Sequence, residues 1–179
     1  MDFKQFTIKS QEAIQKAVEL AMGAGQPTIE PAHLLKGIFA EDENVTDFVF
    51  KKLGANKQLI SQKLDEQLGK LPKVSGENQQ PYLSSAANQA LTKAKDFLKT
   101  FGDEFVAIEH LLLGILAGAD ATAQLLKDQG IAEKPLIEAI KELRDEAIKE
   151  CDLISEKMTS KQIAEAQRLA REWKLKSPQ

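Results

Sequence analysis

Apolar residues recur every three or four positions along most of the chain, a spacing typical of helices with one buried face. Glycine and proline interrupt the pattern at short intervals, and alternating strand-like runs are nearly absent. The pattern therefore predicts an all-α fold. The helices it predicts before residue 144 cover 8–22, a segment from 31, 44–54, 56–69, 84–101, 109–116, 120–130 and a segment from 135.

Residues that start and stop helices support these limits. Thr7 and Asp120 are predicted N-caps, and Ser84 or Ser85 opens the fifth helix. Pro31 suits the first turn of a helix, where a missing amide costs nothing. Glycines follow several of the predicted segments, as is common where helices end.

Two stretches are imperfect copies of each other, IEPAHLLKGIF at 29–39 and VAIEHLLLGIL at 106–116. The register between them is constant, because 110 − 33 and 114 − 37 both equal 77 for the paired histidines and glycines. Six of 13 positions are identical when 28–40 is aligned with 105–117. The chain is therefore interpreted as a pseudo-twofold duplication of a four-helix unit, with a groove where the copies meet.

The predicted boundaries follow from this duplication. Residues 1–70 form repeat one, 71–81 a connector with two prolines, and 82–148 repeat two. Residues 149–179 form an extension in which Thr159 and Gln162 make a capping box. The box precedes an amphipathic ninth helix whose apolar stripe is Ile163, Ala166, Leu169, Ala170 and Trp173.

Composition removes several classes of function. The net charge is −3, from 27 acidic and 24 basic residues without a basic stripe, which argues against nucleic acid as a partner. No apolar run approaches the roughly 20 residues that span a bilayer, so we expect no membrane segment. Cys151 is the single cysteine and fits a reducing compartment, hence a cytoplasmic location.

The residues that could carry catalysis do not form a known constellation. His33 and His110 are the only histidines, and a metal site usually needs three or four converging ligands, so a repeated structural role is favoured. The sequence contains no phosphate-binding loop, and acidic neighbours surround Cys151. We therefore expect no enzyme activity, no metal and no cofactor.

Four motifs occur in a familiar order: FTIKSQEAIQKAVELA, IEPAHLLKGIF, LPKV with YLSSAANQAL, and GDEFVAIEHLLLGIL. Together, over about residues 1–144, they resemble the N-terminal domain of ClpB-type protein disaggregases. The resemblance implies a double four-helix module, tethered to AAA+ ATPase rings, that recognises unfolded or aggregated polypeptides. It also implies a groove with Thr7, Asp103 and Glu109 at its edge and Leu91 in its floor.

Three alternatives remain beside this interpretation. ClpC-type domains carry a glutamate in both repeats that can receive phosphorylated arginine, but here Glu109 has Ala32 as its counterpart, which favours the disaggregase type. The asymmetric acidic residues Asp103, Glu104 and Glu109 could also simply cap a helix. The C-terminal segment is similar to the end of Sel1-like helical repeats, so the chain could instead be an adaptor that binds a folded partner or a Clp machine.

Overall fold

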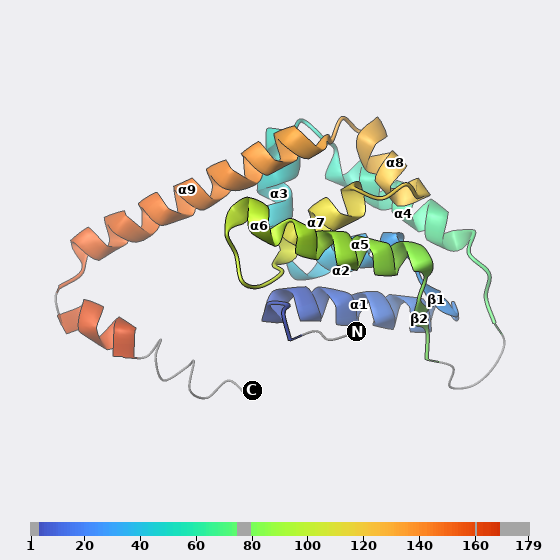
Figure 1. The fold of residues 1–179 in the computed structure, drawn as a ribbon, viewed down its shortest axis with the longest axis horizontal. Coiled ribbons are helices and arrows are strands. Elements are labelled where there is room, and N and C mark those ends of the chain that lie inside the picture. Colours follow the sequence, from blue (N-terminus) through green and yellow to red (C-terminus); the bar gives the residue numbers. More distant parts are fainter. Residues whose placement is uncertain (1–3, 75–79, 160, 169–179) are drawn as a thin grey trace. The chain divides into compact units, whose positions relative to one another are not determined.

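A computed structural model describes residues 4–74, 80–159 and 161–168 (Figure 1). The all-α prediction is confirmed, with the addition of two strands of two residues each. In chain order the elements are α1 (Ile8–Gly23), β1 (Thr28–Ile29), α2 (Pro31–Glu41), α3 (Glu43–Lys52), α4 (Lys57–Gly69), β2 (Tyr82–Leu83), α5 (Ser85–Asp96), α6 (Leu98–Phe101), α7 (Ile108–Leu116), α8 (Ala121–Asp128) and α9 (Glu133–Lys157).

Side-chain caps fix the start of four helices where the sequence predicts them. Thr7, Asn56, Ser84 and Asp120 each accept a hydrogen bond from the backbone N–H three residues further along. The donor–acceptor distances are 3.3, 3.0, 3.1 and 3.1 Å in that order. These caps satisfy backbone donors that no preceding turn can serve, and each contributes about 1 kcal/mol.

Three local predictions differ from the structure. The third helix begins at Glu43, one residue before the predicted start at 44, because Asp42 is its cap and accepts from the Val45 N–H at 2.9 Å. The helix predicted over 84–101 is interrupted at Phe97, which separates α5 from α6. The two strands were missed because two residues are too few for an alternating pattern.

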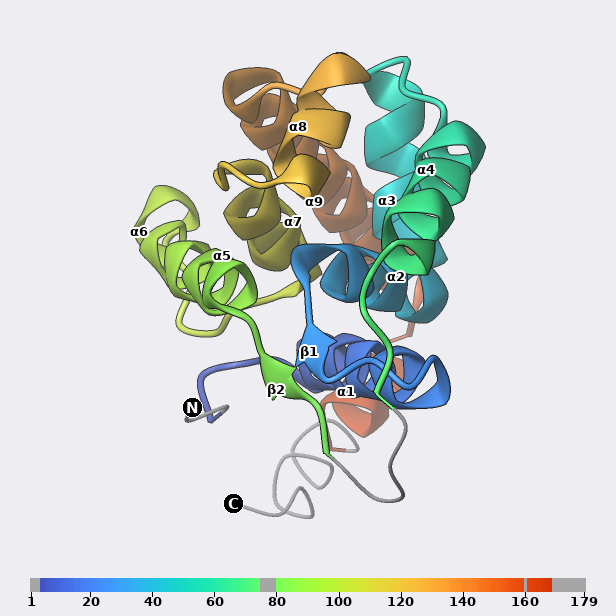
Figure 2. The same cartoon turned by 90° about the vertical axis from the view of Figure 1, so that its right-hand side faces the viewer.

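The repeats are interlaced through their backbones. β1 pairs in parallel with β2, with Ile29 opposite Leu83, and Phe6 forms a parallel bridge with Val106. These pairings are equivalent, since 6 + 77 = 83 and 29 + 77 = 106. The segment before α1 therefore pairs with the segment before α7, and the segment before α5 pairs with the segment before α2. Figure 2 shows β1 and β2 side by side, between the helices of the two repeats.

The duplicated glycines lie where helices cross. A Cβ atom on Gly37 of α2 would collide with the backbone carbonyl of Ala13 in α1. A Cβ atom on Gly114 of α7 would collide in the same way with Ala90 in α5, and 13 + 77 = 90. The repeated phrase thus contains glycine because each helix pair approaches too closely for any side chain.

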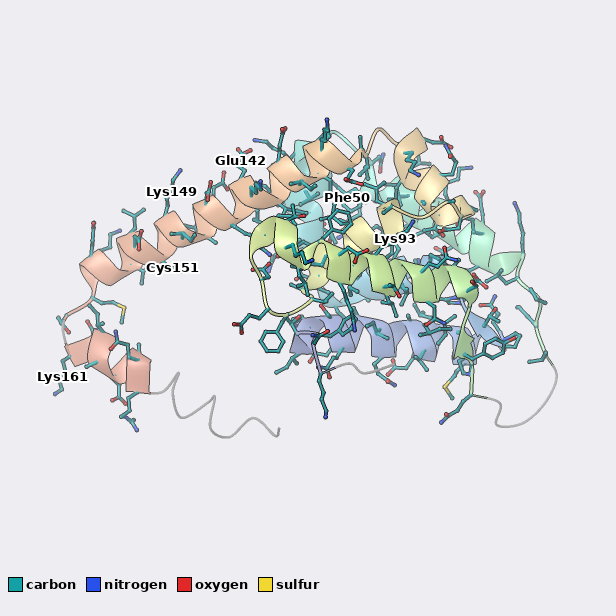
Figure 3. The ribbon with its side chains drawn as sticks, viewed as in Figure 1. Phe50, Lys93, Glu142, Lys149, Cys151 and Lys161 are labelled. Carbon is teal, nitrogen blue, oxygen red and sulfur yellow. The ribbon has the colours of Figure 1, made fainter. Side chains whose placement is uncertain are left out.

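Contacts divide the chain into two compact units, Met1–Ile140 and Lys141–Gln179, and α9 runs from one into the other. The interior of the first unit is mainly aliphatic and also contains Phe50, which is 1% exposed (Figure 3). The helix over 120–130 and the one containing Pro135 in its first turn are present as α8 and α9.

In the second unit, α9 exposes Ile148, Leu153 and Ile154, and the thiol of Cys151 is also exposed (Figure 3). The predicted capping box is present, because the Thr159 N–H donates to Gln162 Oε1 at 2.9 Å and the Gln162 N–H donates to Thr159 Oγ1 at 3.3 Å. Residues 161–168 are helical. The rest of the predicted apolar stripe, Leu169, Ala170 and Trp173, lies outside the described residues.

Candidate functional site

A groove of about 520 Å³ runs along α1 and is closed at one side by strand residues of both repeats. Its floor and walls are mostly apolar, with amide side chains and one carboxylate at the rim. The lining residues are Ile8, Gln11, Glu12, Ile14, Gln15, Val18, Ile29, Pro81 and Leu83. Because Ile8 comes from repeat one and Leu83 from repeat two, this is a groove of the kind the duplication predicts.

The interlaced backbone holds the two walls together. The Ser84 N–H donates to the Ile29 carbonyl at 3.0 Å, which ties β2 to β1 beside the groove. At the start of α1, the Thr7 N–H donates to the Val106 carbonyl, also at 3.0 Å. Ile8, next to Thr7 in the chain, is 54% exposed, so an isoleucine lies at the groove with about half of its surface in water. Such a side chain gains free energy, about 25 cal/mol per Å², when an apolar partner covers it.

The corresponding face of α5 in repeat two has a different character. The register of 77 places Ser85, Asn88 and Lys95 where α1 has Ile8, Gln11 and Val18. The Lys95 Nζ lies 5.5 Å from the centre of the Phe6 ring, in a cation–π arrangement. The face of α1 that lines the groove is thus more apolar than the equivalent face of α5.

The four residues expected from the family resemblance occupy places of different kinds. Thr7 caps α1 next to the groove, and its Oγ1 donates to Ser10 Oγ at 3.0 Å. Leu91 is 1% exposed and belongs to the core beneath α5. Glu109 is half-buried in the first turn of α7. None of these residues, nor Asp103, is among the described residues that line the groove.

Asp103 contacts a buried histidine. Its Oδ2 lies 3.2 Å from the Nε2 of His110, whose side chain has no exposed surface. The Ala107 N–H donates to the Nδ1 of the same ring at 3.0 Å. The structural role predicted for this histidine therefore has a physical basis: the imidazole joins the start of α7 to the loop before it.

His33 repeats this arrangement with a neutral partner. The Glu30 N–H donates to its Nδ1 at 3.0 Å, so in the neutral ring the proton is on Nε2, which lies 2.7 Å from the Oε1 of Gln26. The register relates the partners, since 26 + 77 = 103. Burial lowers the pKa of His33, against a smaller opposing effect of the Glu30 carboxylate.

Helix periodicity places Ile8, Ile14 and Val18 on one apolar side of α1, but periodicity alone does not distinguish buried from exposed positions. Ile8 is 54% exposed, whereas Ile14 is buried. The available signal was the comparison of the repeats. At two of these positions the second copy has Ser85 and Lys95, and a lysine is not typical of a buried stripe.

Within the described part of the chain, no three His, Cys, Asp or Glu side chains gather in the way a metal ion requires. Among the same residues, no helix combines the length and hydrophobicity needed to cross a membrane.

Comparison with known proteins gives a consistent family. The family described as the Clp repeat (R) N-terminal domain matches residues 5–129. The chaperone protein ClpB of Bacteroides thetaiotaomicron is 51% identical over 144 residues, which cover 80% of this chain and 16% of that protein. ClpB of Porphyromonas gingivalis is 46% identical over the same shares of the two chains. The chain thus spans about one sixth of the length of these relatives.

Solved structures agree on the fold. The Hsp104 N-terminal domain from Candida albicans superposes with a TM-score of 0.68 at 24% identity, over 79% of this chain and 92% of that one. A ClpV N-domain in complex with a VipB peptide has a TM-score of 0.59 at 13% identity, over 76% and 89%. The family model and the ClpB relatives confirm the family resemblance, and the solved structures confirm its fold, whereas the resemblance of the C-terminal segment to Sel1-like repeats stays a prediction.

Proposed function

Since the chain belongs to the family of Clp repeat N-terminal domains found in ClpB chaperones, we propose that it binds exposed apolar segments of unfolded or aggregated proteins in the groove along α1. The observation that supports this most directly is the half-exposed Ile8 beside Val18, Pro81 and Leu83 in an open groove of about 520 Å³. An apolar lining without a fixed pattern of polar groups rewards hydrophobic surface rather than one sequence. We therefore expect weak affinity and broad selectivity.

In this proposal the domain catalyses no reaction and acts in the cytoplasm. It would present captured segments to AAA+ ATPase modules of a Clp machine, which would supply the energy for threading. A peptide complex is known for the structurally similar ClpV N-domain, which is consistent with a peptide-binding role for this fold. ATP hydrolysis by the isolated chain would contradict the non-enzymatic part of the proposal.

The direct test replaces Ile8 with glutamate. Ile8 is the first residue of α1, where a carboxylate is favoured by the helix dipole, so the variant should remain folded. We expect Ile8→Glu to weaken binding of a permanently unfolded casein about tenfold, which corresponds to ~1.4 kcal/mol. Fluorescence anisotropy of labelled casein measures the change.

Leu59→Glu is the matched control. Leu59 is also an exposed apolar residue in the first turn of a helix, 37% exposed in α4, but does not line the groove. The control should bind casein like the unmodified chain. Equal losses in the two variants would indicate a general effect of charge and would contradict a specific groove.

A second candidate function is that of an adaptor that binds a folded partner through the C-terminal segment. The exposed Ile148, Leu153 and Ile154 on α9 favour it. Removal of residues 150–179 separates the two functions, because a groove-based binder should keep its affinity for casein and an adaptor should lose its partner. Loss of casein binding after this truncation would contradict the groove proposal.

A further inference from the structure

β2 has an edge whose backbone groups face away from β1. Tyr82 and Ser84 donate their N–H groups to the carbonyls of Pro27 and Ile29, at 3.1 and 3.0 Å. In a parallel ladder the residue between two such donors points its N–H and C=O to the opposite side. Leu83 is that residue. Within the described part of the chain, no group accepts a hydrogen bond from the Leu83 N–H.

The Leu83 carbonyl is only loosely held. Asn88 Nδ2 lies 3.4 Å from it, at the long limit of a hydrogen bond. In the other repeat, the equivalent amide of Gln11 donates to the Phe6 carbonyl at 2.8 Å. The register relates both pairs, since 11 + 77 = 88 and 6 + 77 = 83. One of the two equivalent edges is therefore closed by a short hydrogen bond, and the β2 edge is more readily opened.

The surroundings of β2 suit an incoming chain. Tyr82 is 65% exposed, and the side chains of Pro81 and Leu83 line the groove. Three residues before β1, the Val74 N–H donates to the Gly25 carbonyl at 2.9 Å, so the chain itself runs along the approach to β1. The edge at Leu83 is the place where a further strand can be added to β2.

Charge in the groove selects an uncharged occupant. Among the described residues, the lining contains one ionised side chain, Glu12, and its Oε2 is 3.2 Å from the Nζ of Lys9. The pair is close to neutral, so neither a basic nor an acidic segment gains from the groove itself. An apolar segment fits the lining, and its backbone fits the open edge.

We propose that the groove takes its polypeptide in an extended conformation, as a third strand hydrogen-bonded to Leu83 at the outer edge of β2. This inference rests on the proposed function and specifies its mode. Alternate side chains of the segment lie on the apolar lining, and the intervening ones face water. The main chain supplies affinity without reading sequence, which explains how one groove serves many clients.

The test uses the whole chain and a fluorescein-labelled, capped peptide with a central Val-Phe-Val-Leu-Val run. Each central residue is N-methylated in turn, which removes one backbone donor and adds bulk at the edge. We expect losses of about tenfold at every second residue and little change between them, because only alternate backbone groups face β2. Losses that follow the side-chain spacing of a helix, at every third or fourth residue, would overturn the strand mode.

Variants of the protein test the same bond from its other end. Leu83→Pro removes the unused N–H at an edge where proline is tolerated, and Leu83→Ala shortens the side chain but keeps the N–H. We expect Leu83→Pro to bind the peptide about tenfold more weakly than Leu83→Ala does. Asn88→Ala frees the Leu83 carbonyl and should tighten binding. Hydrogen exchange of the Leu83 amide, followed by NMR, should slow when the peptide saturates the groove.

The outcomes separate this inference from the function on which it rests. If the peptide binds and Ile8→Glu weakens it, but the two Leu83 variants are equal and N-methylation has no alternating effect, the strand mode is wrong and the groove remains. If neither peptide nor casein binds, both proposals fail. A Leu83 amide that exchanges at the same rate with and without bound peptide would also overturn the strand mode.

Discussion

Repeat one presents Ile8 and Val18 to the groove, whereas repeat two has Ser85 and Lys95 at the equivalent positions of α5. The interiors of the repeats do not diverge in this way. Gly37 and Gly114 both face a helix backbone too closely to allow a Cβ atom. The difference teaches that a duplicated framework can keep its close helix contacts while the outward faces of the two copies diverge.

The two buried histidines have one contact that is the same in both repeats and one that differs. His33 and His110 each accept a hydrogen bond from the backbone at the start of a helix through Nδ1. Their Nε2 atoms meet different groups, the amide of Gln26 in repeat one and the carboxylate of Asp103 in repeat two. The backbone contact is thus shared and the outer contact has changed, which suggests four ways to test the comparison.

The largest effect is expected from the glycines at the helix crossings. Gly37→Ala and Gly114→Ala should each lower the free energy of unfolding by about 3 kcal/mol, because the added methyl group meets a backbone carbonyl that cannot move away alone. Urea denaturation followed by circular dichroism measures the change. Gly69→Ala is the control, since nothing lies within 4 Å of a Cβ atom there. Tolerance of alanine at only one crossing would show that the two frameworks are not equivalent.

An exchange of the outer residues should affect binding more than stability. Val18→Lys gives repeat one the residue of repeat two, removes apolar surface from the groove and should weaken casein binding by roughly tenfold. The reverse change, Lys95→Val, removes the cation near Phe6 and exposes apolar surface on α5. We expect it to add weak casein binding to the Val18→Lys chain. Anisotropy titrations of the single and double variants test this, and an unchanged affinity for Val18→Lys would mean that the groove of repeat one is not the binding surface.

A smaller effect is expected from the pH dependence of stability. Burial lowers the pKa of His33 in the folded chain, so the unfolded chain takes up a proton first as the pH falls. The contribution of His33 to stability is then complete above its ordinary pKa of about 6.5 and decreases as the pH falls from there toward the lower pKa of the folded state.

His33→Asn should reduce the loss of stability between neutral and mildly acidic pH, although it lowers stability overall because of the lost packing. Urea denaturation at a series of pH values measures both quantities. Identical pH slopes for the variant and the unmodified chain would show that protonation of His33 does not limit acid stability.

The sequence predicted the framework well because its signals are local or duplicated. Helix periodicity, the caps Thr7, Ser84 and Asp120, and the constant register of 77 gave the all-α duplicated fold. Interlacing was not predictable, because each strand has two residues and its partner is in the other repeat. The sequence predicted that a groove would form where the repeats meet, but it did not predict which residues line the groove. The lining depends on the backbone pairing between repeats, in which Thr7 and Ser84 donate to Val106 and Ile29.

The smallest effect concerns Thr7, where the family resemblance and the geometry meet. Thr7 caps α1 one residue before Ile8, and aspartate is an equally good cap, so Thr7→Asp should change the free energy of unfolding by less than about 0.5 kcal/mol. The added charge lies beside the apolar groove and should weaken casein binding about threefold, which corresponds to ~0.7 kcal/mol. Asn56→Asp also places a carboxylate at a helix cap, that of α4, but away from the groove, so it should leave binding unchanged. A large loss of stability in Thr7→Asp with casein binding intact would make Thr7 a structural cap alone, and the edge of the groove would then begin at Ile8.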